Sequence, residues 1–193
     1  MNEVAYVTPP ASLRALEIDT HAIGFGMGSD TRTGALLRTL AASKRRARLL
    51  ELGTGTGLAT AWLLDGMDDV SQLDTVDNDP QCVEIARRQL GHDARVRFHL
   101  MDGAAFLTEA EPGSYDLIFA DTWPGKFSQL DEALALLKPG GIYVIDDLLP
   151  QPNWPEGHAP KVPRLLETLA QRPDLTLCPL AWSSGLVIAV KTM

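Results

Sequence analysis

The feature that most constrains the fold is an alternation, from Ala47 onward, of short runs rich in strand-forming residues with stretches of helical period. Five such runs begin at residues 47, 72, 94, 115 and 141 and read ARLLELG, QLDTVDND, ARVRFHLMDG, YDLIFADT and GIYVIDDLL. Strands that alternate with helices build a parallel sheet whose crossover helices cover its faces. The helices are expected at residues 33–43, 57–65, 80–90, 103–110, 127–137 and 163–171.

The C-terminal region breaks this alternation. The runs LTLCPLAW and LVIAVKT flank a short loop from Ser183 to Gly185, which is typical of a β-hairpin. The last strand is therefore expected to be antiparallel to its partner. With the five earlier strands, this predicts an α/β fold with a seven-stranded, mostly parallel sheet and helices on both faces. The 193 residues suit a single domain, 1–193, because a chain of this length can bury one full core.

The charge balance argues against a nucleic-acid partner. A formal net charge of −8 opposes a duplex-binding surface, because such affinity comes largely from Lys and Arg that neutralise phosphates. No apolar run approaches the length of a membrane span, and Glu3, Arg14, Glu17 and Asp19 interrupt any leader-peptide core. We therefore expect a cytoplasmic protein with neither a nucleic-acid nor a membrane partner.

A glycine-rich loop follows the first strand, in the stretch LLELGTGTGLAT that begins at Leu49. Such loops usually hold phosphate, but Glu51 places a carboxylate two residues before Gly53, where it would repel a pyrophosphate. A dinucleotide loop of the form G-x-G-x-x-G would also need a glycine where Leu58 stands. The loop therefore favours a ligand other than a nicotinamide dinucleotide.

Acidic residues recur where the parallel strands end, at Glu51, Asp77, Asp102, Asp121 and the pair Asp146 and Asp147. Open α/β sheets bind ligands at this edge, so the carboxylates are expected to share one rim. The alternative for each is a structural role, because helix caps and turns also place Asp after strands. A rim of carboxylates suits a cationic ligand. S-adenosylmethionine fits, since it has a sulfonium, an ammonium and a ribose diol that Asp77 could bind.

These motifs resemble the class I S-adenosylmethionine-dependent methyltransferases, and more narrowly the metal-dependent O-methyltransferases of the catechol and caffeoyl-CoA type. The matching pieces begin at residues 27, 49, 76, 119 and 136 and read MGSDTRTG, LLELGTGTG, VDNDPQC, FADTWPGKF and LLKPGGIYVIDDLL. The resemblance implies one Rossmann-like methyltransferase domain over 1–193, with residues 1–32 as an N-terminal cap segment. It also implies a set of cofactor-binding residues: Met27, Gly28, Glu51, Gly53, Gly55, Gly57, Asp77, Asn78, Asp102, Gly103 and Asp121.

The resemblance further implies a divalent cation such as Mg²⁺, held by Asp121, Asp146 and Asp147, since hard oxygen ligands suit such ions. Asp147 stands where the family has asparagine, and Pro124 stands where it has a lysine that acts as general base. The nearest lysine is Lys126, which either reaches the same space or lies in solvent near the start of a helix. The catalytic candidates are therefore Asp121, Lys126 and Asp147.

A proline-rich segment, residues 150–163, follows the fifth strand and should lie over the ligand edge as a stiff substrate-side loop. Trp154 and His158 in this loop, together with Trp123, are the candidates for contact with an aromatic acceptor. The alternative for Trp154 is that it anchors the loop to the body of the domain. His158 would suit a base near neutral pH, although its spacing does not require that role.

The sequence therefore predicts an S-adenosylmethionine-dependent O-methyltransferase that acts on a small acceptor, such as a vicinal-diol aromatic. The three aspartates at matching positions favour a divalent metal. Pro124, at the position of the family's lysine, counts against it. The nearest alternative is a metal-independent N- or O-methyltransferase. A nicotinamide-dependent oxidoreductase and a non-catalytic cofactor-binding protein are more distant alternatives. Members of the family that the chain resembles often form homodimers, but the sequence does not fix the oligomeric state.

Overall fold

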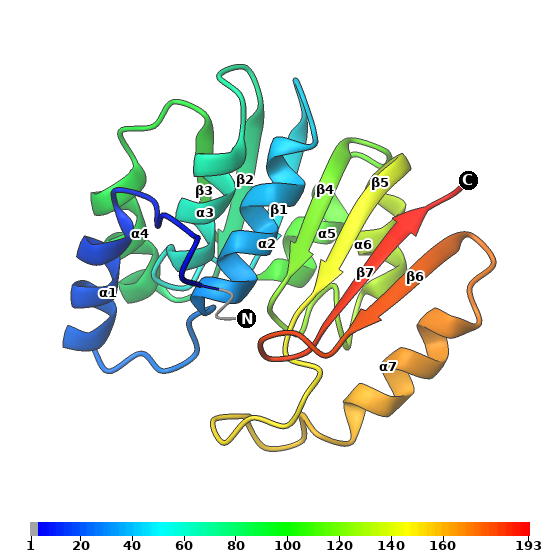
Figure 1. Cartoon of the computed structure of the whole chain (residues 1–193). Coiled ribbons are helices and arrows are strands. Elements are labelled where there is room, and N and C mark those ends of the chain that lie inside the picture. Colours follow the sequence, from blue (N-terminus) through cyan, green and yellow to red (C-terminus); the bar gives the residue numbers. More distant parts are fainter. Residues whose placement is uncertain (1–3) are drawn as a thin grey trace.

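A seven-stranded sheet forms the centre of the computed structural model, which describes residues 4–193 (Figure 1). Its strands are β1 (Arg48–Leu52), β2 (Gln72–Asp77), β3 (Val96–Leu100), β4 (Tyr115–Ala120), β5 (Leu137–Ile145), β6 (Leu175–Leu180) and β7 (Leu186–Lys191). Their order across the sheet is β3-β2-β1-β4-β5-β7-β6. β7 is antiparallel to both β5 and β6, and the other pairs are parallel. The expected mostly parallel sheet with a C-terminal antiparallel hairpin is confirmed.

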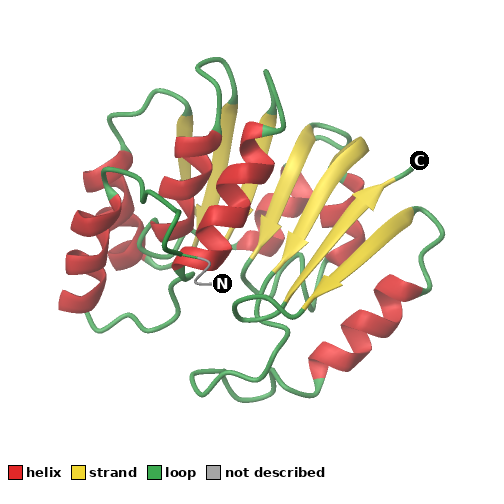
Figure 2. Ribbon diagram, in the orientation of Figure 1, coloured by secondary structure: helices red, strands yellow, loops and turns green. Residues whose placement is uncertain are grey.

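Helices cover both faces of this sheet, as expected (Figure 2). They are α1 (Leu13–Ala22), α2 (Thr31–Ala42), α3 (Leu58–Gly66), α4 (Pro80–Leu90), α5 (Gly103–Glu109), α6 (Leu130–Ala135) and α7 (Lys161–Ala170). Neighbouring side chains of a strand point to opposite faces, so Leu49 packs in the core under α1 to α4 and Leu50 in the core under α5 to α7. Because both faces are covered, the central strands read as nearly continuous apolar runs.

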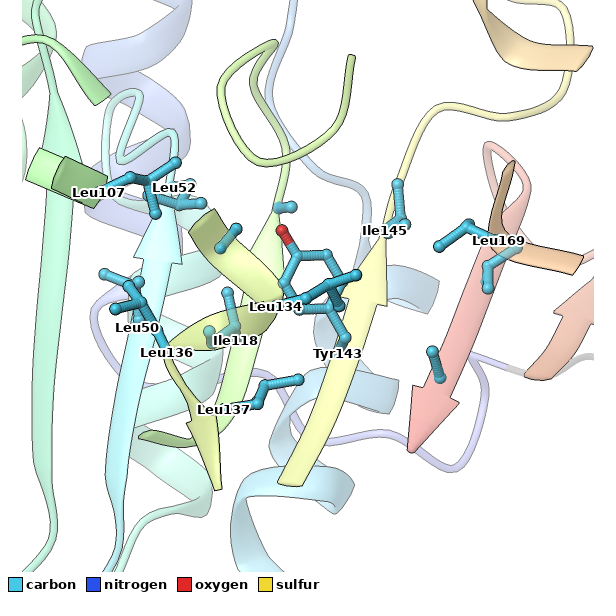
Figure 3. Close-up of a cluster of buried hydrophobic side chains, with 14 of the residues drawn as sticks. Leu50, Leu52, Leu107, Ile118, Leu134, Leu136, Leu137, Tyr143, Ile145 and Leu169 are labelled. Atoms are coloured by element: carbon cyan, nitrogen blue, oxygen red, sulfur yellow. The ribbon is translucent and has the colours of Figure 1, made fainter. Parts of the chain in front are cut away.

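The second of these cores also fixes the loop that follows β4. Figure 3 shows Tyr143 of β5 among side chains such as Leu52, Ile118 and Leu134, with its hydroxyl at the edge of the cluster. That hydroxyl donates a hydrogen bond of 2.6 Å to the carbonyl oxygen of Gly125. The ring is fully buried, so the loop after β4 is tied to a rigid part of the core.

Most helices lie where the sequence predicts them, because their first residues carry clear signals. α4 spans the expected residues 80–90, with Pro80 in the first turn. The Asp79 carboxylate caps it by accepting the amides of Gln81 and Cys82 at 2.8 and 3.2 Å. The helices expected at 33–43, 57–65 and 103–110 differ from α2, α3 and α5 by one or two residues at an end.

The helix expected at residues 127–137 is wrong in its extent, since α6 spans only Leu130–Ala135. The amides of Lys126, Phe127 and Ser128 all donate to the Trp123 carbonyl, and Gln129 then has a φ of 49°. This compact turn delays the helix. At the other end, Leu137 pairs with Tyr115 and so belongs to β5 rather than to the helix.

Two further differences concern the ends of the chain. The helix expected from residue 163 begins at Lys161, because Pro163 lies in the first turn, where proline is tolerated. The N-terminal segment 1–32 contains α1, which the sequence analysis did not predict, and the start of α2. Residues 1–3 of that segment lie outside the described residues. Among residues 4–193, no helix has both the length and the apolar character that a membrane span needs.

The carboxyl ends of the parallel strands all lie at the lower edge of the sheet in Figure 1. The loops that follow β4 and β5, the connection between α1 and α2, and the turn between β6 and β7 gather at the same edge. Segments far apart in the sequence therefore meet where an open α/β sheet binds its ligands.

Candidate active site

The glycine loop between β1 and α3 lies between the ends of β2 and β4, the two strands that flank β1. Gly53, Gly55 and Gly57 have φ angles of 101°, 50° and 93°, a region that other residues avoid. The Gly53 amide donates to the Val76 carbonyl at 2.9 Å, and the Gly55 amide donates to the Asp77 carboxylate at 2.7 Å. On the other side, a Cβ at Gly53 would lie 3.2 Å from the carbonyl oxygen of Asp121. The absence of side chains leaves the loop backbone open to close approach by a ligand.

A cleft of about 360 Å³ opens beside this loop, a size within the range of about 300–1,000 Å³ typical of small-ligand sites. It is lined by Phe25, Met27, Gly53, Gly55, Asp77, Asn78, Asp79, Cys82, Asp121, Thr122, Trp123, Lys126, Asp147, Pro155 and His158. The structure thus brings candidates for cofactor binding, acceptor contact and catalysis into one cleft. In the cleft, Asp77 accepts the Gly55 amide and, at 2.9 Å, the Asp79 amide, so its carboxylate has a fixed orientation.

Some cofactor candidates do not line this cleft. Asp102 caps α5, where its carboxylate accepts the amides of Ala104 at 2.9 Å and Ala105 at 3.1 Å. This is the capping alternative that the sequence leaves open. A Cβ on the next residue, Gly103, would lie 3.2 Å from the Pro124 side chain. Gly57 precedes the first residue of α3, and Gly28 lines the neighbouring pocket described below.

Glu51 lies beneath the glycine loop and has no exposed surface. Its Oε2 accepts hydrogen bonds from the hydroxyls of Thr60 and Thr75, each at 2.5 Å. Its Oε1 is buried without a hydrogen-bond partner among the described residues. Burial, only partly offset by the two threonine hydroxyls, raises the pKa of Glu51 from its ordinary 4.5 to about 8. The side chain is therefore mostly neutral near pH 7 and adds no charge to the rim of the cleft, in contrast to the charged carboxylate that the sequence argument assumed.

An acidic pocket of about 170 Å³ adjoins the cleft. It shares Met27, Asp121 and Asp147 with the cleft. The rest of its lining consists of Gly28, Ser29, Asp30, Asp146, Gln151, Asn153, Ser183 and Ser184. The side-chain amide of Asn153 donates to the Gly26 carbonyl at 2.8 Å and so ties the proline-rich loop to the N-terminal segment. The charged side chains among these lining residues are all carboxylates.

The carboxylates between the cleft and the pocket repel one another. Burial first, and then the charge of Asp146, raises the pKa of Asp121 well above its ordinary value. Burial also raises the pKa of Asp146 to about 6, although the Ser184 hydroxyl and the Asp147 amide, at 2.7 Å, donate to that carboxylate. Ser29 donates to Asp121 at 3.2 Å. These donors stabilise the two charges only in part.

Lys126 lies beside the backbone of Asp146 rather than in solvent. Its side chain is 2% exposed, and its Nζ donates to the carbonyl oxygen of Asp146 at 3.1 Å. Its positive charge lowers the pKa of both Asp121 and Asp146, against the larger effect of burial. Of the two alternatives that the sequence allows for this lysine, the solvated position is wrong, since the side chain is buried and lines the cleft.

The residues as arranged do not fit a divalent cation. In the part of the chain that the structure describes, no three His, Cys, Asp or Glu side chains come together as a metal-ligand group. One oxygen of Asp146 already accepts from the Ser184 hydroxyl and the Asp147 amide, and an ammonium group lies beside the same residue. The set Asp121, Asp146 and Asp147 therefore receives no support as a metal centre from this geometry.

The aromatic candidates split into two groups. Trp123 lies at the cleft with 38% of its surface exposed, and the Lys161 ammonium lies 4.7 Å from its ring centroid. Trp154 instead stacks on His158 at 4.4 Å, and Phe127 meets the same imidazole edge-on at 4.8 Å. The His158 Nε2 donates to the Asp147 carbonyl at 2.9 Å, and burial lowers the pKa of this histidine. Trp154 and His158 thus anchor the proline-rich loop beside Asp147.

Sequence reasoning missed several residues that line the two cavities, and three of them make notable contacts. Phe25 lines the cleft and would lie 3.3 Å from a Cβ at Gly55, while Ser29 and Ser184 donate to the acidic side chains. Ser29 lies within the matching piece MGSDTRTG, which is a signal that could have identified it. Ser184 lies in the β6–β7 turn, and only the sheet order brings that turn beside β5.

Comparison with known proteins finds similarity to methyltransferases. A family model described as a methyltransferase domain matches residues 50–148. A Mycobacterium avium protein provisionally named an O-methyltransferase is 36% identical over 133 residues, which cover 64% of this chain and 59% of that protein. The match thus spans less than two thirds of that relative's length.

Two solved structures share the fold over nearly the whole chain. The O-methyltransferase TomG from Streptomyces achromogenes, in complex with SAM, has a TM-score of 0.83 and 25% identity, and the match covers 99% of this chain and 94% of TomG. An O-methyltransferase from Bacillus cereus, in complex with SAH, has a TM-score of 0.83 and 20% identity, and the match covers 97% of this chain and 94% of that protein.

Proposed function

This chain belongs to the family of proteins with a methyltransferase domain, and we propose that it transfers a methyl group from S-adenosylmethionine to an oxygen atom of a small acceptor. The observation that carries the proposal is the shared wall of the two cavities. Asp121 and Asp147 line both the cleft beside the glycine loop and the acidic pocket next to it. A cofactor in the cleft and an acceptor in the pocket would therefore meet at these two residues.

The chemistry of the cleft suits this cofactor. The open backbone at Gly53 and Gly55 admits the methionine portion, and the Asp77 carboxylate can accept hydrogen bonds from ribose hydroxyls. Asp121 offers a negative charge to the ammonium or the sulfonium. When bound, S-adenosylmethionine supplies a methyl carbon that is activated by the positive sulfur.

The residues of the shared wall would then align the acceptor and remove its proton. In an in-line displacement, an acceptor oxygen forms a bond to the methyl carbon while the carbon–sulfur bond breaks and its electron pair stays on sulfur. Alignment of this kind supplies much of the acceleration. The hydroxyl proton must leave during the step, and Asp121 and Asp147 are the carboxylates in position to accept it.

The acidic pocket also sets an expectation for the acceptor. Its carboxylates, amides and hydroxyls favour a molecule with several hydroxyl groups or a positive charge, and they oppose a carboxylate or a phosphate. An aromatic ring can contact Trp123 at the mouth of the cleft. A vicinal-diol aromatic meets both conditions, and an amine on its side chain would improve the match.

The test is transfer of labelled methyl from S-adenosylmethionine to three vicinal-diol aromatics that carry a neutral, an amine or a carboxylate side chain. We expect transfer to the amine and neutral compounds and little to the carboxylate. A matched variant, Asp121→Asn, keeps the size of the side chain but removes its charge, and should lower the rate strongly. Preference for the carboxylate compound, or binding of S-adenosylhomocysteine without transfer to any acceptor, would contradict the proposal.

A further inference from the structure

We propose that the buried ammonium of Lys126 is a built-in cation for the carboxylates between the cleft and the pocket, and that methyl transfer by this chain therefore needs no divalent metal. The inference rests on the proposed function. It starts from a disagreement: the resemblance implies a metal at Asp121, Asp146 and Asp147, whereas these residues are not arranged as a metal-ligand group among residues 4–193.

The backbone around Lys126 holds its side chain inward. The amides of Lys126 and Phe127 both donate to the Trp123 carbonyl, at 3.0 and 2.8 Å. The preceding residue, Gly125, has a φ of 86°, and its carbonyl accepts the Tyr143 hydroxyl. A Cβ at Gly125 would lie 2.5 Å from the Leu52 side chain, so this turn is pressed against the core and only glycine fits. The direction of the lysine is therefore set by a rigid turn rather than by solvent.

The surroundings of the ammonium explain why it stays there. Its Nζ donates to the Asp146 carbonyl at 3.1 Å, and it lies 5.3 Å from the centroid of the Phe127 ring. Among the residues that line the cleft and the pocket, Lys126 is the only lysine or arginine, and it lines the cleft together with the carboxylates Asp77, Asp79, Asp121 and Asp147. A buried positive charge is stable only beside such partners.

The effect of this charge reaches the residues that a metal would have held. Lys126 lines the same cleft as Asp121 and Asp147, and its ammonium hydrogen-bonds to the backbone of Asp146. One cation in this position is thus next to all three residues. It also contributes a positive charge close to the place where an acceptor oxygen would lose its proton.

The experiment compares the response to Mg²⁺ of three proteins: the unmodified chain, Lys126→Met and Lys138→Met. Lys138→Met is the matched control because it also removes one lysine charge, here from an ion pair with Asp116. Lys138 lies at the start of β5, at the opposite end of that strand from Asp146. Thermal unfolding with millimolar Mg²⁺ or with a chelator is the main measurement. Binding of S-adenosylhomocysteine and transfer of labelled methyl are measured in parallel.

We expect the melting temperature and the methyl transfer of the unmodified chain and of Lys138→Met to be the same with Mg²⁺ and with chelator. Lys126→Met should lose about 10²-fold in transfer, as expected for a removed electrostatic group, and Mg²⁺ should now raise its melting temperature, because the carboxylates lack a counter-charge. A purely structural role for the lysine would lower stability without creating a response to Mg²⁺.

The inference is overturned if Mg²⁺ stabilises the unmodified chain, if the chelator abolishes its methyl transfer, or if Lys126→Met responds to Mg²⁺ no more than Lys138→Met. Should Lys126→Met fail to fold, Lys126→Gln provides the second variant, and the comparison on the unmodified chain still decides. If the unmodified chain binds no S-adenosylhomocysteine, the proposed function fails, whereas the Mg²⁺ comparison still tests the role of Lys126.

Discussion

Replacing Glu51 by Gln should make the protein more stable at alkaline pH, although Glu51 is completely buried and hydrogen-bonded. The reason is its protonation. Gln has the shape of the neutral carboxyl, and its carbonyl oxygen can accept the hydroxyls of Thr60 and Thr75 as Oε2 does. The amide nitrogen would take the place of Oε1, which has no hydrogen-bond partner among the described residues. The variant therefore keeps the packing and removes the cost of ionisation. The amide N–H groups buried there without an acceptor cost about 1–3 kcal/mol, and this cost does not change with pH.

The magnitude follows from the pKa of Glu51, which burial raises from 4.5 to about 8. Because the folded state binds the proton more tightly, this group stabilises the fold fully below its unfolded pKa, and that stabilisation is lost as the pH rises toward the folded pKa. Each unit of pKa difference corresponds to about 1.4 kcal/mol. Between about pH 5 and about pH 8, the unmodified protein should therefore lose about 3 kcal/mol relative to the Gln variant.

The assay is thermal or denaturant unfolding of both proteins across this pH range. For a chain of this size, about 1 kcal/mol shifts Tm by about 2–4 °C, so the difference in Tm should grow by about 10 °C from acid to alkaline pH. The other titrating groups cancel in the comparison. Glu84→Gln is the control, because it makes the same chemical change at a side chain that is exposed on α4. A flat difference for Glu51→Gln, or a lower Tm for that variant at alkaline pH, would refute the reasoning.

Three other predictions concern the cofactor cleft, the acceptor pocket and the core. Asp77→Ala removes the acceptor of the Gly55 amide and the proposed acceptor of the ribose hydroxyls, so calorimetry should show Kd for S-adenosylhomocysteine raised about 10- to 100-fold. Asn153→Ala frees the proline-rich loop from Gly26, and steady-state kinetics should show the acceptor KM raised about 2- to 10-fold with cofactor binding unchanged. Gly34→Ala would place a Cβ 2.3 Å from the buried ring of Trp62, and denaturant unfolding should show a loss of about 1–3 kcal/mol.

The sheet and most helices could be predicted because their signals are local. The apolar runs of the strands, the Asp79 cap with Pro80, and the glycine before the final strand each identify an element without knowledge of the rest of the chain. The sequence also identified most of the residues that line the cleft, because strands that run parallel bring their carboxyl ends to one edge.

The errors concern residues whose environment is set by distant parts of the chain. Glu51 looks like a charged rim residue, yet its side chain points under the loop to Thr75 of the neighbouring strand. Lys126 looks like a surface lysine, yet the turn from Trp123 and the contact of Gly125 with Tyr143 direct it inward. The same turn shortened the helix expected at 127–137. The contacts of Glu51 with Thr75 and of Gly125 with Tyr143 join segments that are far apart in the sequence, so no local pattern encodes them.

The central claim is that the cleft beside the glycine loop binds S-adenosylmethionine rather than a nicotinamide dinucleotide. The most direct test is calorimetric titration of the unmodified protein with S-adenosylhomocysteine and, separately, with NADH. We predict binding of S-adenosylhomocysteine at one site per chain, weakened by Asp77→Ala, and no binding of NADH. Binding of NADH in its place, or S-adenosylhomocysteine binding that Asp77→Ala leaves unchanged, would contradict the account.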